Sequence, residues 1–511
     1  MTCAFNRKRK SIDMKQLLQT IMLLMPMLAD AETIEIEGLY YNLMDKGNAA
    51  EVVKAPEGYS GEVSIPETVT YEGKQYSVTS IGDMAFDKSS NLLAIHIPES
   101  IKRIGTYAFA SCEKLDKIFI TNLTSWCNIT FVELPFYYPH KLILNDNEIT
   151  QLDIPDGITF VSDYAFCYLS GLEKVTVPNS VLSIGANAFT GCVELGIIEL
   201  SDGITKIRER AFQGCSNLNT INLPNSISQI DDYVFSGCGF TSIDLPNSIT
   251  ILGNGVFSSC KNLVSISLPN NLSTLREGMF LACFNLNSVV VPNSVTYIMR
   301  DAFRDCTRLT SISLSSNLTS IEKYAFYGCR SLENISIPDN VLGIADYAFG
   351  YCHKLKNISL GKKLNWIGEQ GFAFCEAIEN VYCYAEEPPY TSNDVFKGSY
   401  TEQARLYVPD AVIGAYNSTT PWSGFGEVKP LSESSGLSSV LNHDVNIQGH
   451  NGLVKITGLT NGIKVGVYNV SGMLLGGATS MENEATIETR MRAGDIAIIH
   501  IGNNSYKVIM Q

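Results

Sequence analysis

Cysteine is the residue whose number and regular spacing in this sequence could support chemistry. Ten of the 14 cysteines each follow a phenylalanine by three residues, and they form a row: Cys112, Cys192, Cys215, Cys238, Cys260, Cys283, Cys306, Cys329, Cys352 and Cys375. A thiol can act as a nucleophile, bind a metal ion or form a disulfide, depending on its surroundings. Cys3, Cys127, Cys167 and Cys383 lie outside the row. Leu169 occupies one position of the row at which the repeat would place a cysteine.

The cysteine row follows an internal repeat. The phenylalanines that precede it belong to a series at 86, 109, 166, 189, 212, 235, 257, 280, 303, 326, 349 and 372, and the spacing from Phe166 onward is 23 residues except for 22 between Phe235 and Phe257. The consensus is C-x-x-L-x-x-I-x-L-P-N-S-I-x-x-I-x-x-x-A-F-x-x. A period of about 20 to 29 residues with L-x-x-I-x-L is typical of a leucine-rich solenoid. We therefore predict a repeat solenoid of about 12 coils, mostly parallel β.

Each part of the repeat has its own expected structure, illustrated by residues 215–238. The segment T-I-N-L alternates like a short strand with one face inward, and Pro224 ends it. The segment S-I-S-Q-I predicts a second short extended piece. The segment D-D-Y-V-F-S-G predicts a short helical or 3-10 turn, with Phe235 as its buried side chain.

Three interpretations of the cysteine row follow from a stack of such coils. Disulfides suit an exported chain, but equivalent positions of stacked coils point in parallel, which opposes the near-perpendicular disulfide dihedral. A metal ion needs converging ligands, and a straight row cannot converge. The remaining interpretation is a structural row of small apolar thiols that face inward and are not activated by any cation. We favour this third interpretation.

The regions outside the repeat predict the domain organisation. A basic stretch, an apolar run and Ala29-Asp30-Ala31 indicate a signal peptide cleaved after Ala31, with Met1 or Met14 as the start. Lys141 to Thr150 predicts a hairpin around Asn145-Asp146-Asn147. The expected parts are a signal peptide at 1–31, an N-terminal cap at 32–62, the solenoid at 63–390 with an elaborated coil at 121–153, a C-terminal cap at 391–430, a linker at 431–441 and an antiparallel β-sandwich at 442–511.

The repeat carries a family resemblance. The phrase L-P-N-S-I-x-x-I-x-x-x-A-F-x-x-C resembles the BspA-like leucine-rich repeats of Bacteroides-type bacteria, as do the opening EGYSGEVSIPETVTYEGKQYSVTSIGDMAF and the interruption T-S-W-C-N-I-T-F. This resemblance covers about residues 35–430 and implies a cell-surface adhesin, since some members bind extracellular-matrix proteins of a host. The pieces V-G-V-Y-N-V-S-G and K-V-I-M-Q are similar to the C-terminal sorting domains of type IX secretion.

The sequence offers little for catalysis. It lacks G-x-S-x-G, H-E-x-x-H, a P-loop and C-x-x-C, and its six histidines include no pair at metal-ligand spacing. His96 is expected to be a solvated surface side chain. We therefore expect no catalytic residues, cofactor or metal, and a hydrolase would require a pocket with paired carboxylates. The net charge of −15 argues against nucleic acid as a partner, and no segment is long enough for a transmembrane span.

The outward strand positions are the better candidates for binding, because a broad sheet of small polar groups suits a flat macromolecular surface. Phe119, Val290 and Tyr382 stand out as apolar residues that can anchor an interface. The candidate ligand-binding face consists of Phe119, Glu199, Asn219, Thr220, Asn222, Asp244, Ser267, Val290, Ser313, Ser336, Ser359 and Tyr382. We expect an exported or cell-surface protein that binds a protein or glycan of a host or neighbouring cell. The alternative is a structural or scaffold module of a surface assembly, anchored by the C-terminal domain.

The inward interpretation of the cysteine row makes a measurable prediction. In denaturant without reductant, we expect about ten free thiols by titration with a thiol-reactive chromophore, because parallel thiols have no geometry for a bridge. Oxidation of most of these cysteines would contradict the interpretation.

Overall fold

The computed structural model describes residues 33–44, 46–434, 446–450, 452–457, 459, 462–469, 474–481, 484–489, 491, 496–501 and 504–509. The predicted signal peptide, Cys3 and most of the predicted linker lie outside these residues. The chain divides into two compact units. One contains residues up to 121 together with 129–138, and the other contains 122–128 together with residues from 139 onward.

The first unit begins with antiparallel strands and continues into parallel ones. Its larger sheet follows the order β1-β2-β3-β6-β8-β10, with β5 paired to β6. Strands β4, β7 and β9 pair in parallel in a separate sheet. The strands are β1 (Thr33–Ile36), β2 (Leu39–Met44), β3 (Ala49–Val53), β4 (Ser60–Ser64), β5 (Thr68–Tyr71), β6 (Lys74–Ile81), β7 (Asn91–His96), β8 (Arg103–Ile104), β9 (Lys117–Ile120) and β10 (Thr130–Phe131). The pairing changes from antiparallel to parallel where β3 meets β6, which is where coil-on-coil stacking begins.

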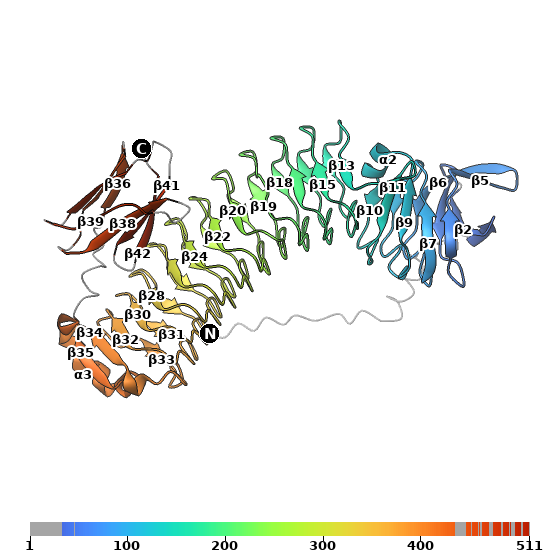
Figure 1. Ribbon diagram of the computed structural model, residues 1–511. Helices are drawn as coiled ribbons and strands as arrows, with labels where there is room; N and C mark the ends of the chain where they lie inside the picture. The colour runs from blue at the N-terminus through green and yellow to red at the C-terminus, as the bar shows by residue number, and fades with distance from the viewer. Residues whose placement is uncertain are drawn as a thin grey trace, which may run out of the picture. The chain divides into compact units, whose positions relative to one another are not determined.

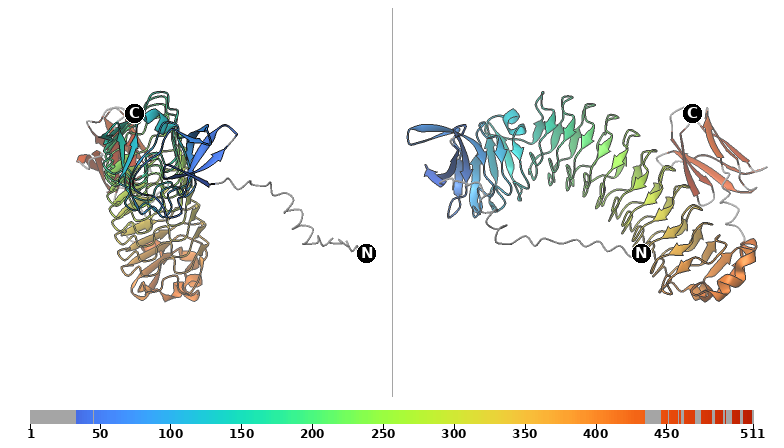
Figure 2. Two further views of the ribbon diagram at one scale, coloured as in Figure 1. Left: turned by 90° about the vertical axis from the view of Figure 1, so that its right-hand side faces the viewer. Right: turned by 180° about the vertical axis from the view of Figure 1, so that it is seen from behind.

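The second unit contains the regular coils, whose short parallel strands follow two rows that we call the first and second ladders (Figure 1). Strand pairing is broken between β17 and β20, β22 and β24, and β26 and β28 in the first ladder, and between β21 and β23 in the second. The first ladder contains β13 (Gln151–Asp153), β15 (Lys174–Thr176), β17 (Ile197–Glu199), β20 (Ser242–Asp244), β22 (Ser265–Ser267), β24 (Ser288–Val290), β26 (Ser311–Ser313), β28 (Asn334–Ser336), β30 (Asn357–Leu360), β32 (Asn380–Cys383), β34 (Arg405–Val408) and β35 (Glu427–Pro430). The second contains β14 (Phe160–Val161), β16 (Ser183–Ile184), β18 (Lys206–Ile207), β19 (Gln229–Ile230), β21 (Ile251–Leu252), β23 (Thr274–Leu275), β25 (Tyr297–Ile298), β27 (Ser320–Ile321), β29 (Gly343–Ile344), β31 (Trp366–Ile367) and β33 (Tyr390–Thr391). The predicted parallel β-solenoid is confirmed, and Figure 2 shows the same stacking from behind.

The turn that carries the repeat phenylalanine is not helical, so the predicted helical or 3-10 turn is wrong. In the coil of Phe235, Tyr233 and Gly237 adopt left-handed backbone conformations with φ of 57° and 74°. The amides of Tyr233, Phe235 and Gly237 donate to carbonyls of the following coil, at 2.8, 3.0 and 2.8 Å. A helix would use these amides within its own turn, so it would give up the bonds that join the coils.

Stacked phenylalanines fill the centre of the second unit. From Phe166 to Phe396, neighbouring rings of the series have centroids 4.9–5.9 Å apart and planes within 21° of parallel. Offset stacking at these distances contributes about 0.5–1.5 kcal/mol per pair beyond burial. The stack ends where Trp422 and Phe425 meet Phe396 edge-on, beside α3 (Ile413–Ser418). The short 3-10 helices of this region are η1 (Thr401–Gln403), η2 (Asp410–Val412), η3 (Trp422–Gly424) and η4 (Leu431–Glu433).

The predicted hairpin after the T-S-W-C motif is confirmed. Strands β11 (Lys141–Leu144) and β12 (Asn147–Glu148) pair antiparallel, and Asn145 and Asp146 both have positive φ, as a two-residue hairpin requires. The T-S-W-C residues form α2 (Leu123–Cys127), whose N-cap Asn122 accepts a bond from the amide of Ser125 at 2.9 Å. The buried indole of Trp126 donates to the carbonyl of Ala165 at 3.0 Å.

One coil departs from the predicted strand pattern. Residues 219–222 form no strand, although T-I-N-L predicts one, and the first ladder is interrupted between β17 and β20. The next coil is the one that is a residue shorter, and a side chain on its Gly239 would lie 2.2 Å from the carbonyl oxygen of Ser216. In the second ladder β19 and β21 stay paired, and the pairing breaks between β21 and β23.

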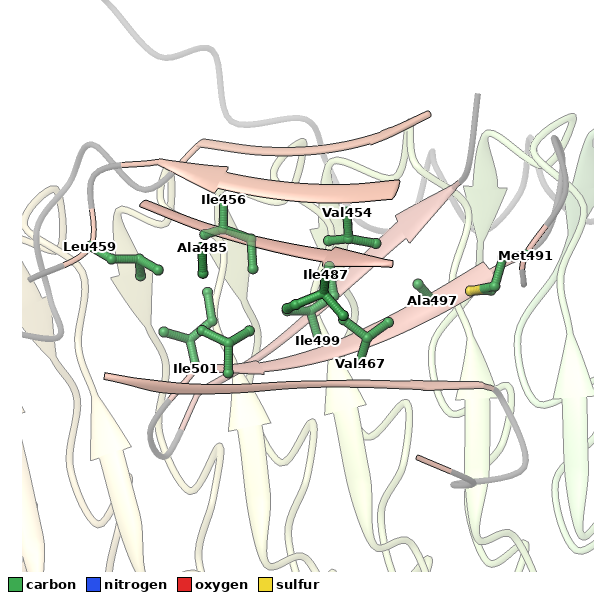
Figure 3. Packing of buried hydrophobic residues seen from close by; sticks show 11 residues of the cluster. Val454, Ile456, Leu459, Val467, Ala485, Ile487, Met491, Ala497, Ile499 and Ile501 are labelled. Carbon is green, nitrogen blue, oxygen red and sulfur yellow. The ribbon is translucent and has the colours of Figure 1, made fainter. Parts of the chain in front are cut away.

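The C-terminal residues form two antiparallel sheets around one core. One sheet joins β36 (Asn446–His450), β37 (Leu453–Thr457) and β40 (Glu484–Glu488), and the other joins β39 (Leu474–Thr479), β38 (Lys464–Asn469), β41 (Ile496–Ile501) and β42 (Asn504–Ile509). Both sheets contribute side chains to a common cluster, which includes Val454, Ile487, Val467 and Ile499 (Figure 3). The predicted antiparallel β-structure is therefore present at this end of the chain.

Candidate functional site

The cysteine row lies inside the coils, and each of its thiols bonds to the backbone. All thirteen described cysteines are free and buried. Every thiol of the row donates to the carbonyl of the phenylalanine in the preceding coil, with Sγ to O distances of 3.0–3.5 Å. The row therefore joins coils by hydrogen bonds, a role that the sequence did not suggest.

Serine at the end of the row supports the same interpretation. Ser399 follows Cys375 by 24 residues and donates its hydroxyl to the carbonyl of Phe372 at 2.6 Å. A hydroxyl and a thiol thus make the same bond to the same class of carbonyl. This replacement is the sequence signal that would have identified the hydrogen bond, because a purely apolar position would not favour serine.

Burial also determines the protonation of the row. It raises the pKa of Cys112, Cys192 and Cys260 to about 12. The pKa of Cys215, Cys238, Cys283, Cys306, Cys329 and Cys352 is likewise raised well above its ordinary value by desolvation. Since the thiolate is the nucleophile and the metal ligand, these groups are suited to neither role at neutral pH. Among the described residues, no group of three His, Cys, Asp or Glu side chains is placed to hold a metal ion.

The outward side chains of the first ladder, which we call the first-strand face, contain most of the predicted binding residues. Six of the predicted residues are exposed: Glu199, Asn219, Thr220, Asn222, Asp244 and Val290. Ser267, Ser313 and Ser336 are partly buried. Glu199 forms an ion pair with Lys174 at 2.7 Å, and Val290 is the exposed apolar residue among the six, at 38%.

Two predicted binding residues are not accessible, which corrects the prediction. Tyr382 is only 6% exposed because its ring stacks on Tyr407 of β34, with centroids 4.9 Å apart. Ser359 pairs in register with Tyr382 and is buried as well. Tyr407 of β34 therefore covers Tyr382 at this end of the first-strand face.

Phe119 and His96 lie in the first unit and contact each other. Their rings stack with centroids 4.3 Å apart, and His96 Nε2 lies 2.6 Å from a carboxylate oxygen of Glu62. Phe119 is therefore partly buried. His96 is a surface side chain, as expected, with 39% of its side chain exposed, and it also has an aromatic and an acidic partner.

An amide ladder occupies part of the first-strand face. The side-chain amide of Asn357 donates to Asn334 at 2.8 Å, and that of Asn380 donates to Asn357 at 2.9 Å. Such ladders stabilise the stacking of identical strands. These three asparagines therefore contribute to coil pairing.

The outward side chains of the second ladder, which we call the second-strand face, include exposed aromatic residues that the sequence interpretation missed. Tyr297 is 47% exposed, Trp366 is 40% exposed and Tyr390 is 80% exposed. They occupy the position before the second inward residue of each repeat, where this chain also has Ser183, Lys206, Gln229 and Ile251. The recurrence of aromatic residues at this one repeat position was their signal in the sequence.

The hollow beside the β11–β12 hairpin holds a single carboxylate. It is lined by Leu144, Asn145, Asn147, Glu148, Ile149, Thr150 and Gln151. Glu148 in this lining bonds to Lys141 at 2.9 Å. The hollow therefore lacks the paired carboxylates that glycoside hydrolysis requires.

Two parallel ladders, a phenylalanine stack and buried hydrogen-bonding thiols define the chain as a leucine-rich solenoid. The BspA type leucine-rich repeat region, in six copies, matches residues 66–135, 140–228, 182–310 and 298–412. The chain belongs to this family, as the resemblance in the sequence predicted. No curated protein matches the sequence.

Solved structures of bacterial repeat proteins are similar to this chain. A leucine-rich repeat protein from Bacteroides ovatus ATCC 8483 is 27% identical, with 70% of this chain and 99% of the other covered and a TM-score of 0.48. A leucine-rich cell surface protein from Faecalibacterium prausnitzii A2-165 is 25% identical, with coverages of 68% and 94% and a TM-score of 0.44. None of the helices in the described part of this chain is long and apolar enough to cross a membrane.

The raised thiol pKa values predict how stability depends on pH. The unfolded thiols ionise near pH 9, whereas Cys192 and Cys260 stay protonated in the fold up to about pH 12. The free energy of unfolding should therefore fall between these values, by about 1.4 kcal/mol per pH unit for each such thiol. We expect the double variant Cys192→Ala/Cys260→Ala to have a shallower slope by about 2.7 kcal/mol per pH unit in urea titrations from pH 9.5 to 11.

The control for this prediction is Leu263→Ala, which removes a buried side chain that does not titrate. It should lower stability at every pH and leave the slope unchanged. Equal slopes in the wild type and the double cysteine variant would contradict the buried, protonated state of these thiols.

Proposed function

We propose that the chain is an exported or cell-surface protein that binds a macromolecule of a host or neighbouring cell through its first-strand face. The observation that carries this proposal is the set of exposed polar side chains along that face, Glu199 and Asp244 among them, with Val290 as an apolar anchor. Asn219, Thr220 and Asn222 are also exposed, in the coil that forms no first-ladder strand. A flat face of this kind suits a protein or glycan surface better than a small substrate.

Membership of the family and the composition support the same proposal. The leucine-rich solenoid is typically an interaction scaffold without enzymatic activity. The basic and apolar N-terminal stretch followed by Ala29-Asp30-Ala31 favours export, and the net charge of −15 disfavours nucleic acid as the partner.

A charge placed on the first-strand face should weaken binding. We expect Val290→Asp to lower affinity at least tenfold for whichever matrix protein, mucin or glycan the wild type retains in surface plasmon resonance, because it buries an unpaired charge in the contact. Tyr297→Asp is the matched control, since Tyr297 lies in the same coil with 47% exposure but on the second-strand face. Equal losses in both variants, or no ligand for the wild type, would contradict the proposal.

A structural role in a surface assembly is the second candidate. The observation that favours it is the separate core of the C-terminal sheets, which includes Val454, Val467, Ile487 and Ile499. A segment with its own core is suited to serve as an attachment point, and its sequence resembles type IX sorting domains. On this view the solenoid spaces or presents other components.

Deletion of residues 442–511 separates the two candidates. The scaffold role predicts that the shortened chain is lost from the cell surface while its far-UV circular dichroism keeps the signal of the solenoid. The measurement is surface labelling of intact cells, with the medium assayed in parallel. Full surface retention of the shortened chain would contradict attachment through this segment.

A further inference from the structure

The second-strand face carries an aromatic pair at one end of the regular coils. Trp366 of β31 and Tyr390 of β33 pair in register on neighbouring strands, and both side chains point outward (Figure 1 labels both strands). Leu342, in the preceding coil, is 49% exposed and adds a third apolar side chain. Neighbouring strands lie about 4.8 Å apart, so Trp366 and Tyr390 form one small patch, and Leu342 lies next to Gly343 in the chain.

Gly343 determines where the indole of Trp366 lies. It pairs with Trp366 in register, and a Cβ built on it would be 2.0 Å from Cε2 and 2.1 Å from Nε1 of the indole. The indole therefore occupies the space that a side chain at 343 would fill, and Gly343 is buried although it lies on an outward position. A ring held in this way loses little conformational freedom when a ligand binds.

Polar and acidic groups surround the patch. The exposed Asn365 precedes Trp366, and its backbone carbonyl accepts the amide of Tyr390 at 2.9 Å. Glu386 and Glu387 are exposed shortly before Tyr390, and none of the ion pairs among the described residues involves them. Lys363 is bonded to the neutral Asn340 at 2.9 Å, and Lys362 pairs with Asp339 at 3.9 Å. Acidic and basic side chains therefore come close to balancing here, so the local charge gives no particular attraction for an ionic ligand.

The size of the patch favours a sugar over a protein. A large side chain presents about 150–250 Å², so Leu342, Trp366 and Tyr390 together expose on the order of 300 Å² of mainly apolar area. A stable protein interface needs about 800 Å² from each partner. One face of a pyranose ring carries C–H bonds that are attracted to the negative face of an aromatic ring, and its hydroxyls need polar neighbours.

We propose that Trp366 and Tyr390 form a binding platform for neutral pyranose sugars of a glycan chain, with Gly343 positioning the indole. This site lies on the second-strand face and does not depend on binding through the first-strand face. Because the nearby acids and lysines come close to balancing, the platform relies on ring contacts, which a neutral sugar supplies.

The chain has its own fluorescent reporter for this site. Of its three tryptophans, Trp126 and Trp422 are buried and Trp366 is exposed. The full chain is titrated with neutral oligosaccharides of glucose, galactose and mannose, with sialylated and sulfated oligosaccharides in parallel. We expect a neutral oligosaccharide to shield Trp366 from acrylamide quenching, and the anionic ones to leave quenching unchanged.

Variants then test which residues bind the sugar. Affinity is measured by calorimetry, because Trp366→Ala removes the fluorescent reporter. Trp366→Ala and Tyr390→Ala should each weaken the retained neutral sugar at least tenfold. Gly343→Ser should do the same without removing an aromatic ring, because it displaces the indole. Tyr297→Ala is the matched control on the same ladder and should bind as the wild type does, with circular dichroism as the check on folding.

Four results would overturn the platform, and the first three concern sugars. They are the absence of shielding by every neutral sugar, unchanged affinity in Trp366→Ala, and preferential binding of the anionic sugars. Loss of a protein ligand, but of no sugar, in Trp366→Ala would assign the patch to a protein contact and would also overturn it. Val290→Asp should leave sugar binding intact, so failure here is distinct from failure of the proposed function.

Discussion

Stacking of identical side chains is the constraint on which the rest of the structure depends. Each coil must present the same inward groups at the same height, because every ring in the phenylalanine stack packs against its counterpart in the next coil. The thiols of the row also recur at the same height in each coil, and each donates a hydrogen bond to a phenylalanine carbonyl of the preceding coil. A single coil has neither partner, so its order comes from its neighbours.

The sequence predicted the parts of the fold that repeat. The spacing of phenylalanine and cysteine was enough to predict the solenoid, and Asn145-Asp146-Asn147 was enough to predict a hairpin, because both depend on local or periodic signals. The helical turn was wrong because inter-coil hydrogen bonds through Phe235 override a local preference. Such bonds depend on the following coil and leave no mark in one repeat.

The candidate site was harder to predict than the fold, because exposure depends on neighbours outside the repeat. Tyr382 has the pattern of an outward residue but is covered by Tyr407 from a strand beyond the regular coils. Trp366 is accommodated by the absence of a side chain at Gly343 in the preceding coil. The repeat pattern within one coil therefore predicts the backbone path, whereas the exposure of a side chain depends on the residues of the neighbouring coils.

The coil that lacks one residue shows how this architecture tolerates change. Across that coil the rings of Phe235 and Phe257 still stack at 5.9 Å, and Cys260 still bonds to Phe235 at 3.0 Å. The first ladder is interrupted before that coil, between β17 and β20, and the second ladder is interrupted after it, between β21 and β23. The missing residue thus changes strand pairing at the surface, and the interior keeps its spacing. A solenoid built in this way can vary the length of one coil by a single residue, with no need to gain or lose a whole repeat.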